Sequence, residues 1–337
     1  MEPFFTPTPI QPLTEDFQHN RFYIKREDLI PLSFGGNKAR KAYYFIQEME
    51  QLQANCLVTY GSSSSNHCRV IAAVAAAKGY PCLIISPSSQ NNPTMNQQLV
   101  ELLDATLIFT PLSQVRETIQ QTLEKLKQDG LRPYFIPGGG HGHNGTQAYV
   151  DAYHEIKAVE AEIGISFDLI FHASGTGTTQ AGLVCGNHLA EDSKEIVGIS
   201  IARDEEKGRP VVIESVKAYL EYCGLSPIKE EKIIFEDQYR AGGYGQFHEG
   251  ITDVIHQVFI REGIALDPTY TGKAYWGMMQ YIKEHQIEHQ TILFVHTGSH
   301  PLFFDQFQKN RHTRSVRNAN HLYRNATASE NGLGSNR

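Results

Sequence analysis

Residues 168–190 read DLIFHASGTGTTQAGLVCGNHLA, and this stretch decides the fold class. An apolar run (DLIFHA) leads into a turn of glycine, serine and threonine (SGTGTT), and an apolar helical segment follows. Residues 56–78 (CLVTY-GSSSS-NHCRVIAAVAAAK) and 291–307 (TILFVH-TGSH-PLFFDQF) repeat this order. Strands that are apolar throughout and alternate with helices are typical of parallel sheets covered on both faces. The sequence therefore predicts an α/β fold.

The chain of 337 residues is long enough for about two domains. No Pro-rich or Ser-rich linker separates two sequential halves, and the pattern changes instead near residues 47–55 and 145–163. We therefore expect a large domain of residues 1–47 and 153–308, a small inserted α/β domain of residues 48–152, and a basic flexible tail of residues 309–337. The carboxyl ends of the strands should place the three strand-to-helix turns in one cleft.

The charge distribution restricts the partners. A net charge of −7 argues against a general nucleic-acid or anionic-membrane surface. Residues 309–337 carry a net charge of +5 and are rich in Asn and Ser, which is typical of a flexible tail, although a tail that binds a partner stays open. The chain lacks an apolar run of about 18 residues and a signal-peptide pattern, so we expect a cytoplasmic protein without membrane contact.

Cysteine and histidine spacings give no metal site. The five cysteines lack C-x-x-C spacing, which fits neither a disulfide framework nor a zinc site. His285 and His289 have the i, i+4 spacing of one helix face but lack the H-E-x-x-H pattern, so we interpret them as an exposed helix face. We predict no metal.

The turn Ser174–Thr179 is suited to an anion. Its two glycines allow backbone amides to approach a ligand, its threonines offer hydroxyls, and the following helix begins with its positive end there. The pattern is neither the P-loop nor the dinucleotide fingerprint. A plain Gly-rich turn also fits this segment taken alone. We expect a phosphate at this turn.

A second cluster, FGGNKARK (34–41), places Lys38 at the start of a predicted helix. The helix dipole disfavours a cation at this end, which would lower the pKa of the amine. A lysine that acts as a Schiff-base nucleophile needs such a lowered pKa. Taken alone, however, the segment fits an ordinary surface lysine better.

Five motifs occur together and in a fixed order: GGNKARK (35–41), SSSSNHCR (62–69), SGTGTTQAG (174–182), DPTYTGK (267–273) and HTGS (296–299). Together they resemble the pyridoxal-phosphate enzymes of the tryptophan-synthase-β-like fold (fold type II), specifically the D-cysteine desulfhydrase and 1-aminocyclopropane-1-carboxylate (ACC) deaminase family. The resemblance covers about residues 12–304. It implies two open, mostly parallel sheets flanked by helices, pyridoxal 5′-phosphate in the cleft between a large and a small domain, and a homodimer.

The resemblance also implies the residues that hold the cofactor. Lys38 corresponds to the Schiff-base lysine, and Lys41 to a residue near the cofactor phosphate. Asn66 corresponds to the amide that binds the pyridoxal 3′-oxygen, and Thr297 to the group near the pyridine nitrogen. The phosphate cup corresponds to five consecutive residues: Gly175, Thr176, Gly177, Thr178 and Thr179.

Further residues correspond to the substrate side of the family's site. Ser65 matches the hydroxyl beside the substrate carboxylate and α-carbon, and Tyr244 and Tyr270 match two active-site tyrosines whose phenols can transfer protons. Lys38, Ser65, Tyr244 and Tyr270 are thus the expected catalytic residues. We expect the substrate to contact Ser65, Asn66, His67 and His141.

Two positions separate the members of the family. ACC deaminases tend to carry Glu where this chain has Thr271 and Leu where it has Thr297, whereas the desulfhydrases carry threonine. The resemblance therefore implies a carbon–sulfur lyase that performs β-elimination on a small amino acid, in the first place D-cysteine, giving pyruvate, sulfide and ammonia.

Other activities stay open at this point. They are an ACC deaminase giving 2-oxobutyrate, a β-eliminating lyase or deaminase for another D- or L-amino acid, and a non-catalytic pyridoxal-phosphate-binding protein. Whether Lys38 or Ser65 takes the α-proton is also open. Departures from the family pattern in the serine loop (62–65), in GGGHGHNG (138–145) and at Ser299 leave the substrate undecided, although the 138–145 segment also fits a solvated loop.

Overall fold

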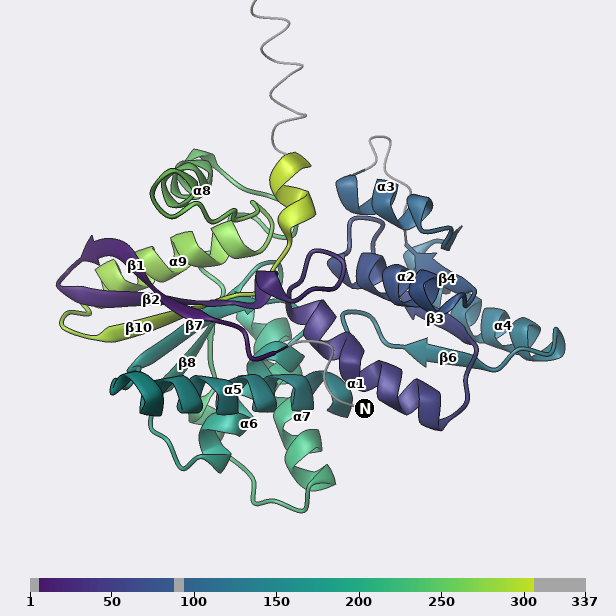
Figure 1. The fold of residues 1–337 in the computed structure, drawn as a ribbon, viewed down its shortest axis with the longest axis horizontal. Helices are drawn as coiled ribbons and strands as arrows, with labels where there is room; N and C mark the ends of the chain where they lie inside the picture. Colours follow the sequence, from purple (N-terminus) through teal and green to yellow (C-terminus); the bar gives the residue numbers. More distant parts are fainter. Residues whose placement is uncertain (1–5, 88–93, 306–337) are drawn as a thin grey trace, which may run out of the picture.

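The computed structural model describes residues 6–87 and 94–305, which contain two sheets (Figure 1). The first sheet has six strands in the order β1 (Ile10–Phe17), β2 (Asn20–Arg26), β10 (Thr291–His296), β7 (Leu169–Ser174), β8 (Glu195–Ser200) and β9 (Ile234–Glu236). The β1–β2 pair is antiparallel, and every other neighbouring pair is parallel. The second sheet is parallel throughout, in the order β5 (Thr106–Phe109), β4 (Cys82–Ser86), β3 (Cys56–Tyr60) and β6 (Pro133–Ile136).

The helices cover both faces of each sheet. Their bounds are α1 Asn37–Gln51, α2 Asn66–Lys78, α3 Met95–Leu102, α4 Val115–Gln128, α5 His143–Ile163, α6 Thr178–Leu189, α7 Glu205–Tyr222, α8 Glu249–Glu262 and α9 Thr271–Glu284. Single-turn 3-10 helices span Glu27–Leu29, Leu112–Gln114 and Glu230–Lys232. Helices α8 and α9 pack on one face of the six-stranded sheet, and α5, α6 and α7 on the other (Figure 1).

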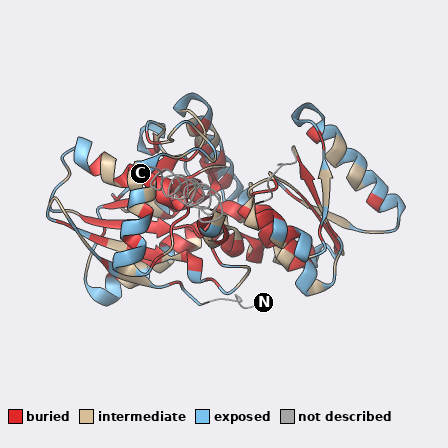
Figure 2. Ribbon diagram, turned by 90° about the horizontal axis from the view of Figure 1, so that it is seen from above, coloured by how far each residue is buried: buried red, intermediate tan, exposed pale blue. Residues whose placement is uncertain are grey.

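The core follows the alternation of side chains along the strands. Phe171 and Phe294 face α9, whereas Ile170 and Leu293 face the helices of the opposite side. Figure 2 shows the buried residues gathered along these strands and the helix faces that cover them. In the four-stranded sheet, Leu57 and Val58 likewise lie in separate cores. The predicted α/β class is confirmed.

The four-stranded sheet lies wholly between β2 and β7 in the sequence, as the predicted nesting requires. The predicted boundaries at residues 47 and 153 fall inside α1 and α5, and α5 lies along one face of the six-stranded sheet in Figure 1. The division into these domains stays a prediction. The predicted basic tail, residues 309–337, lies outside the described residues.

One helical interpretation is wrong. Helix α9 ends at Glu284, His285 is its C-cap, and His289 has a φ of 59°, so the two histidines do not share a helix face.

All five cysteines are free, with only Cys223 exposed. Within the described ranges, no helix combines the length and apolarity needed to cross a membrane.

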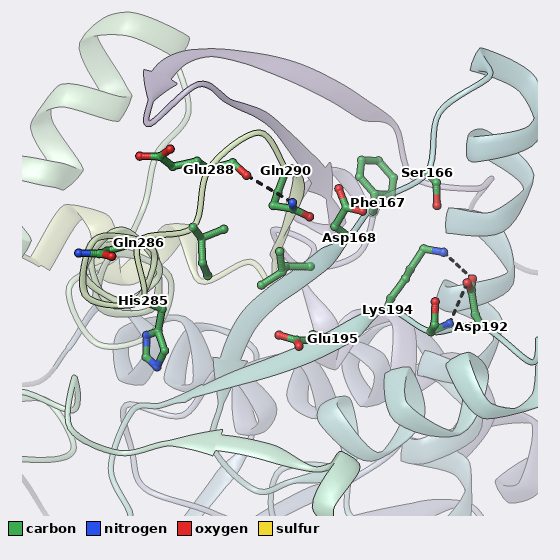
Figure 3. Close-up of a pocket in the computed structure, with 13 residues that line it drawn as sticks. Ser166, Phe167, Asp168, Asp192, Lys194, Glu195, His285, Gln286, Glu288 and Gln290 are labelled. Atoms are coloured by element: carbon green, nitrogen blue, oxygen red, sulfur yellow. Dashed lines mark hydrogen bonds and ion pairs between the residues drawn. The ribbon is translucent and has the colours of Figure 1, made fainter.

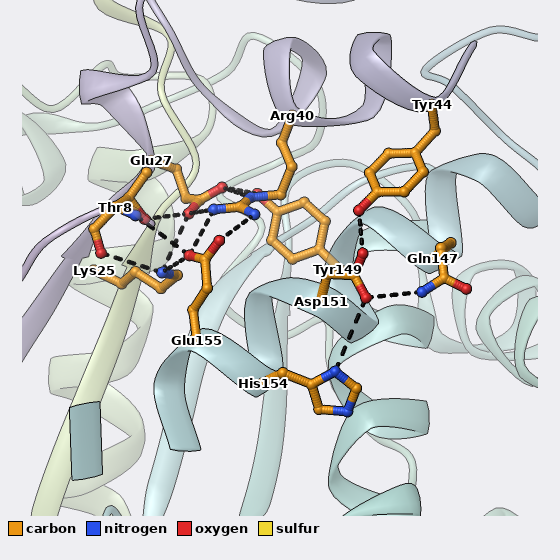
Figure 4. Close-up of polar contacts among 10 residues, drawn as sticks. All are labelled: Thr8, Lys25, Glu27, Arg40, Tyr44, Gln147, Tyr149, Asp151, His154 and Glu155. Carbon is orange, nitrogen blue, oxygen red and sulfur yellow. Dashed lines mark hydrogen bonds and ion pairs between the residues drawn. The ribbon is translucent and has the colours of Figure 1, made fainter. Parts of the chain in front are cut away.

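A buried charge cluster fixes the start of α1 (Figure 4). The Arg40 guanidinium contacts Glu27 (Nε–Oε2, 2.5 Å) and Glu155 (NH1–Oε1, 2.8 Å). The Lys25 Nζ contacts Glu155 Oε2 at 2.5 Å, and the Tyr149 hydroxyl donates to Glu27. These contacts join β2, α1 and α5. They hold in place the helix turn that also carries Lys38 and Lys41.

Candidate functional site

The turns that follow β3, β7 and β10 meet at the carboxyl ends of the strands. The Asn66 Nδ2 donates to the Ser299 Oγ at 2.7 Å, which joins the turns after β3 and β10. The Asn37 Nδ2 donates to the Thr179 Oγ1 at 3.0 Å, and the Asn37 N–H donates to the Thr297 carbonyl at 3.0 Å. The start of α1 therefore connects the turns after β7 and β10.

The Gly- and Thr-rich turn opens α6 as predicted. Gly177 is the N-cap residue with a φ of 96°, and no side chain among the described residues caps this helix end. The first amides of α6 are therefore available to an external acceptor, at the positive end of the helix. A Cβ at Gly139 would lie 2.6 Å from the Thr176 side chain, so the loop after β6 can approach this turn only with glycine.

Two lysines from α1, Lys41 buried and Lys38 half-buried, reach this turn and the loop beside it. The Lys41 Nζ donates to the Thr178 Oγ1 at 2.7 Å, and the Lys38 Nζ donates to the Gly139 carbonyl at 2.8 Å. Burial lowers the pKa of Lys38 to about 8. The pKa of Lys41 is lowered well below its ordinary value, by burial and then by Lys38. Burial is thus the largest cause of both lowered pKa values, whereas the sequence argument relied on the helix dipole.

The donor set fits pyridoxal phosphate. Among the described residues, no carboxylate lies within 4 Å of either lysine amine, so this region has two amines and a helix amino end without an anion. A phosphate dianion would supply that charge at α6 and Lys41. A primary amine with a pKa near 8 is a nucleophile at neutral pH and suits the aldehyde of the same cofactor.

Ser65, Asn66 and His67 begin α2, where Ser65 is the N-cap and its Oγ accepts from the His67 N–H. The Asn66 side chain lies between Ser299 and Asn96, which donates to its Oδ1 at 2.9 Å. The His67 ring turns to the four-stranded sheet, where its Nε2 lies 2.8 Å from the Thr59 Oγ1. Because Thr59 donates to the Ile136 carbonyl, its oxygen is the acceptor for His67. Contact of His67 with a substrate stays a prediction.

Tyr244 and Tyr270 form a pair. Their hydroxyl oxygens lie 2.7 Å apart, and their rings meet edge to face. The Asp267 carboxylate accepts the backbone N–H groups of the next turn, Tyr270 included, and thereby fixes the start of α9. Burial, followed by Tyr244, raises the pKa of Tyr270 well above its ordinary value, so this phenol keeps its proton at neutral pH.

The remaining predicted residues lie in the turns after β10 and β6. Thr297 is buried, and its carbonyl accepts from Asn37. The His141 Nδ1 lies 3.3 Å from the Thr176 carbonyl, beside the phosphate cup, and burial lowers the pKa of this histidine. His143 instead stacks on Tyr222 at the end of α7. Contacts through Asn37, Gly139 and Ser299 thus connect the two lysines, the Gly- and Thr-rich turn, Asn66, Thr297 and His141. His67 points instead to Thr59, and Tyr244 and Tyr270 contact each other. The individual roles of all these residues stay predictions.

Sequence reasoning missed three neighbours of these residues. Gly139 supplies the acceptor for Lys38, Asn37 binds Thr179, and Asn96 binds Asn66. The GGG run at 138–140 and the asparagine of GGNK were visible signals for the first two. Asn96 has no local signal, because its contact depends on how α3 packs beside α2.

Two other features lie outside this group. A hollow of about 520 Å³ opens at the amino ends of β7 and β8, where Lys194 pairs with Asp192 (Figure 3). This is the edge of the sheet opposite to the three turns. Ligand-type atoms of Asp28, His296 and His300 lie within 4.8 Å of one another. However, Arg26 pairs with Asp28, and the Gly298 N–H donates to the His296 Nδ1, so these atoms already have partners.

The family of the chain follows from comparison with known proteins. Residues 1–298 match the pyridoxal-phosphate dependent enzyme family, so the chain belongs to that family and uses pyridoxal phosphate. The chain is 33% identical over 309 residues to the D-cysteine desulfhydrase of Salmonella choleraesuis (strain SC-B67), covering 88% of this chain and 93% of the relative. The D-cysteine desulfhydrase of Salmonella newport (strain SL254) gives the same identity and coverage over 310 residues.

Solved structures agree on the fold. The structure described as an ACC deaminase homologue superimposes with a TM-score of 0.81 at 30% identity, covering 90% of this chain and 93% of that chain. A hydrogen sulfide-producing enzyme from Fusobacterium nucleatum superimposes with a TM-score of 0.58 at 19% identity, covering 87% and 93%. The second likeness shows the fold alone. The chain is thus a fold type II enzyme, as the motifs predict.

Proposed function

We propose that this enzyme converts D-cysteine and water into pyruvate, hydrogen sulfide and ammonia. The observation that carries the proposal is the position of the Lys38 amine, whose pKa is lowered to about 8 by burial and which is adjacent to an anion site built by Lys41 and the start of α6. Identity of 33% to named D-cysteine desulfhydrases over most of the chain supports the choice of substrate.

Lys38, Lys41 and the residues 175–179 would hold the cofactor through its aldehyde and its phosphate, with Asn66 and Thr297 on the sides of the ring. When bound, pyridoxal phosphate supplies an electron sink that acidifies the α-carbon of the substrate. Ser65, the N-cap of α2, would bind the substrate carboxylate at the positive end of that helix. The hydroxyl of Ser65 and the amine of Lys38 are the two candidates to take the α-proton.

The tyrosine pair suits the departure of sulfur. Tyr270 keeps its phenolic proton because burial raises its pKa, and Tyr244 lies within hydrogen-bond distance of it. A phenol that donates to the β-sulfur would let the thiolate leave as a neutral thiol. A protein that only binds the cofactor needs the phosphate site but not this pair, so the pair favours an enzyme.

A second candidate is ACC deamination, favoured by the likeness to the ACC deaminase homologue. The environment of Thr271 argues against ACC deamination. The Thr271 Oγ1 donates to Asp267 Oδ1 at 2.9 Å and is fully buried. A glutamate here, as in the deaminases, would place a second carboxylate beside Asp267, whose pKa burial already raises. Thr271 thus serves the start of α9.

Product identity separates the two candidates. The holoenzyme is incubated with D-cysteine, L-cysteine and ACC, and pyruvate, 2-oxobutyrate and sulfide are measured. The proposal expects pyruvate and sulfide from D-cysteine and no 2-oxobutyrate from ACC; the reverse pattern would establish the deaminase. We further propose that the enzyme is a cytoplasmic homodimer, as the family resemblance implies.

A further inference from the structure

The loop that carries Tyr244 is rich in glycine, and two turn hydrogen bonds join it to itself: the Gly243 N–H donates to the Arg240 carbonyl at 3.1 Å and the Gln246 N–H to the Gly243 carbonyl at 3.2 Å. Gly242, Gly243 and Gly245 adopt positive φ values of 85°, 120° and 71°. Glycine in such conformations leaves the backbone free to move, and Tyr244 itself is 42% exposed. Ala241 and Phe247 pack against the core at the two ends of the loop. A contact from another element to the middle of the loop would help to fix the distance between Tyr244 and Tyr270.

Lys273 supplies such a contact. It lies in the first turn of α9 and is fully buried, and its Nζ donates to the Gly243 carbonyl at 2.7 Å and to the Ile201 carbonyl at 3.0 Å. Burial lowers the pKa of Lys273 to about 8. Among the described residues, no carboxylate lies within 4 Å of this amine. Burying an amine is costly, so its two backbone acceptors are the contacts that keep it inside.

The second acceptor extends the connection to the phosphate cup. Ile201 directly follows β8, and a Cβ at Gly175 would lie 3.7 Å from its Cγ1. One amine therefore joins the Tyr244 loop and the segment after β8 to α9, the helix whose N-cap residue is Tyr270. The two phenols are held by separate contacts. The Asp267 carboxylate accepts from the Tyr270 N–H, and the Lys273 amine donates to the Gly243 carbonyl beside Tyr244.

We propose that Lys273 is a positioning residue of the reaction, which fixes Tyr244 beside Tyr270 through the Gly243 carbonyl. The proposal rests on the proposed function insofar as the tyrosine pair acts on the substrate. Lys273 acts only through Tyr244 and touches neither substrate nor cofactor. Its removal should therefore matter only while the Tyr244 hydroxyl is present.

A double-mutant cycle tests this with the holoenzyme and D-cysteine. The variants are Lys273→Met, Tyr244→Phe and the double variant, with Lys283→Met as the control at an exposed position of the same helix. We expect Lys273→Met to lower kcat about 10- to 100-fold, because misplacement of a reacting group costs this much. In the Tyr244→Phe background, the same change should alter kcat less than about 2-fold. The proposal would be overturned if the fold-losses in kcat of the two single variants multiplied in the double variant. An unchanged kcat in Lys273→Met would also overturn it.

A second measurement does not depend on turnover. Hydrogen–deuterium exchange of peptides covering residues 240–246 should speed up in Lys273→Met and stay unchanged in Lys283→Met. Unchanged exchange at 240–246 would overturn the anchoring. Absence of D-cysteine turnover in the unmodified enzyme would instead refute the proposed function, and the exchange result would still decide on the anchor. If Lys273→Met does not fold, Lys273→Gln, with a shorter amide donor, takes its place in both measurements.

Discussion

The Lys38 Nζ lies 2.8 Å from the carbonyl oxygen of Gly139, so a side chain from α1 is held by the loop after β6. A neutral carbonyl stabilises the protonated amine much less than a carboxylate would, and burial therefore controls the charge of Lys38. Removal from water therefore accounts for the lowered pKa that the proposed role of Lys38 as a nucleophile requires.

The first prediction concerns pH. The pKa of Lys38 is lowered to about 8 from an ordinary 10.5, so the amine is protonated below pH 8 and free above it. The rate at which cofactor-free protein captures pyridoxal phosphate, followed by visible absorbance, should rise with pH and level off above about 8. A rate that continues to climb towards pH 10.5 would contradict the assignment.

The second prediction concerns the phosphate site. Replacing Lys41 by Met removes a charged donor beside Thr178, so the Kd for pyridoxal phosphate should rise about 10- to 100-fold, the range for one charge-assisted hydrogen bond. Affinity for pyridoxal, which lacks the phosphate, should not change. Lys127→Met, at an exposed position of α4, is the control. Equal losses for both ligands would mean that Lys41 serves another part of the cofactor.

A third prediction uses two glycines. A Cβ at Gly36 would lie 2.6 Å from the Thr297 carbonyl oxygen, whereas a Cβ at Gly130 meets nothing within 4 Å, and both glycines have positive φ. Gly36→Ala should therefore lose at least about 1 kcal/mol more stability in urea denaturation than Gly130→Ala. It should also weaken cofactor binding, because it displaces the start of α1. Equal losses of unfolding free energy in the two variants would show that Gly36 does not approach Thr297 closely.

The fourth prediction concerns the buried charge cluster. Burial alone would raise the pKa of Glu27, but Arg40 and Lys25 outweigh it and lower the pKa to about 2. Glu27→Gln leaves Arg40 under-paired and should cost about 3–5 kcal/mol in the free energy of unfolding. Glu162→Gln, exposed on α5, should cost about 0.5 kcal/mol or less.

The sign of the pH effect follows from the same residue. Because the folded-state pKa of Glu27 lies below its ordinary value of 4.5, its contribution is complete above pH 4.5 and is lost as pH falls towards 2. The difference in unfolding free energy between the unmodified enzyme and Glu27→Gln should therefore narrow over that interval. A difference that stays constant down to pH 2 would contradict the charge pairing.

Local patterns made much of the fold and site predictable. The apolar strands and the SGTGTT turn are contiguous in sequence, so β7, its turn and α6 follow from residues 168–190. The contact of Lys38 with Gly139 spans 101 residues, and that of Arg40 with Glu155 spans 115. Such pairs depend on how the sheets pack together, which no local pattern carries. His285 and His289 failed as a helix pair because α9 ends before both.

One measurement tests the central claim most directly. Purified holoenzyme is given D-cysteine, and pyruvate, sulfide and ammonia are quantified alongside the Lys38→Ala variant. The account predicts the three products in equal amounts from the unmodified enzyme, and neither products nor covalently held cofactor in Lys38→Ala. Equal turnover by Lys38→Ala, or no pyruvate and sulfide from the cofactor-loaded enzyme, would contradict it.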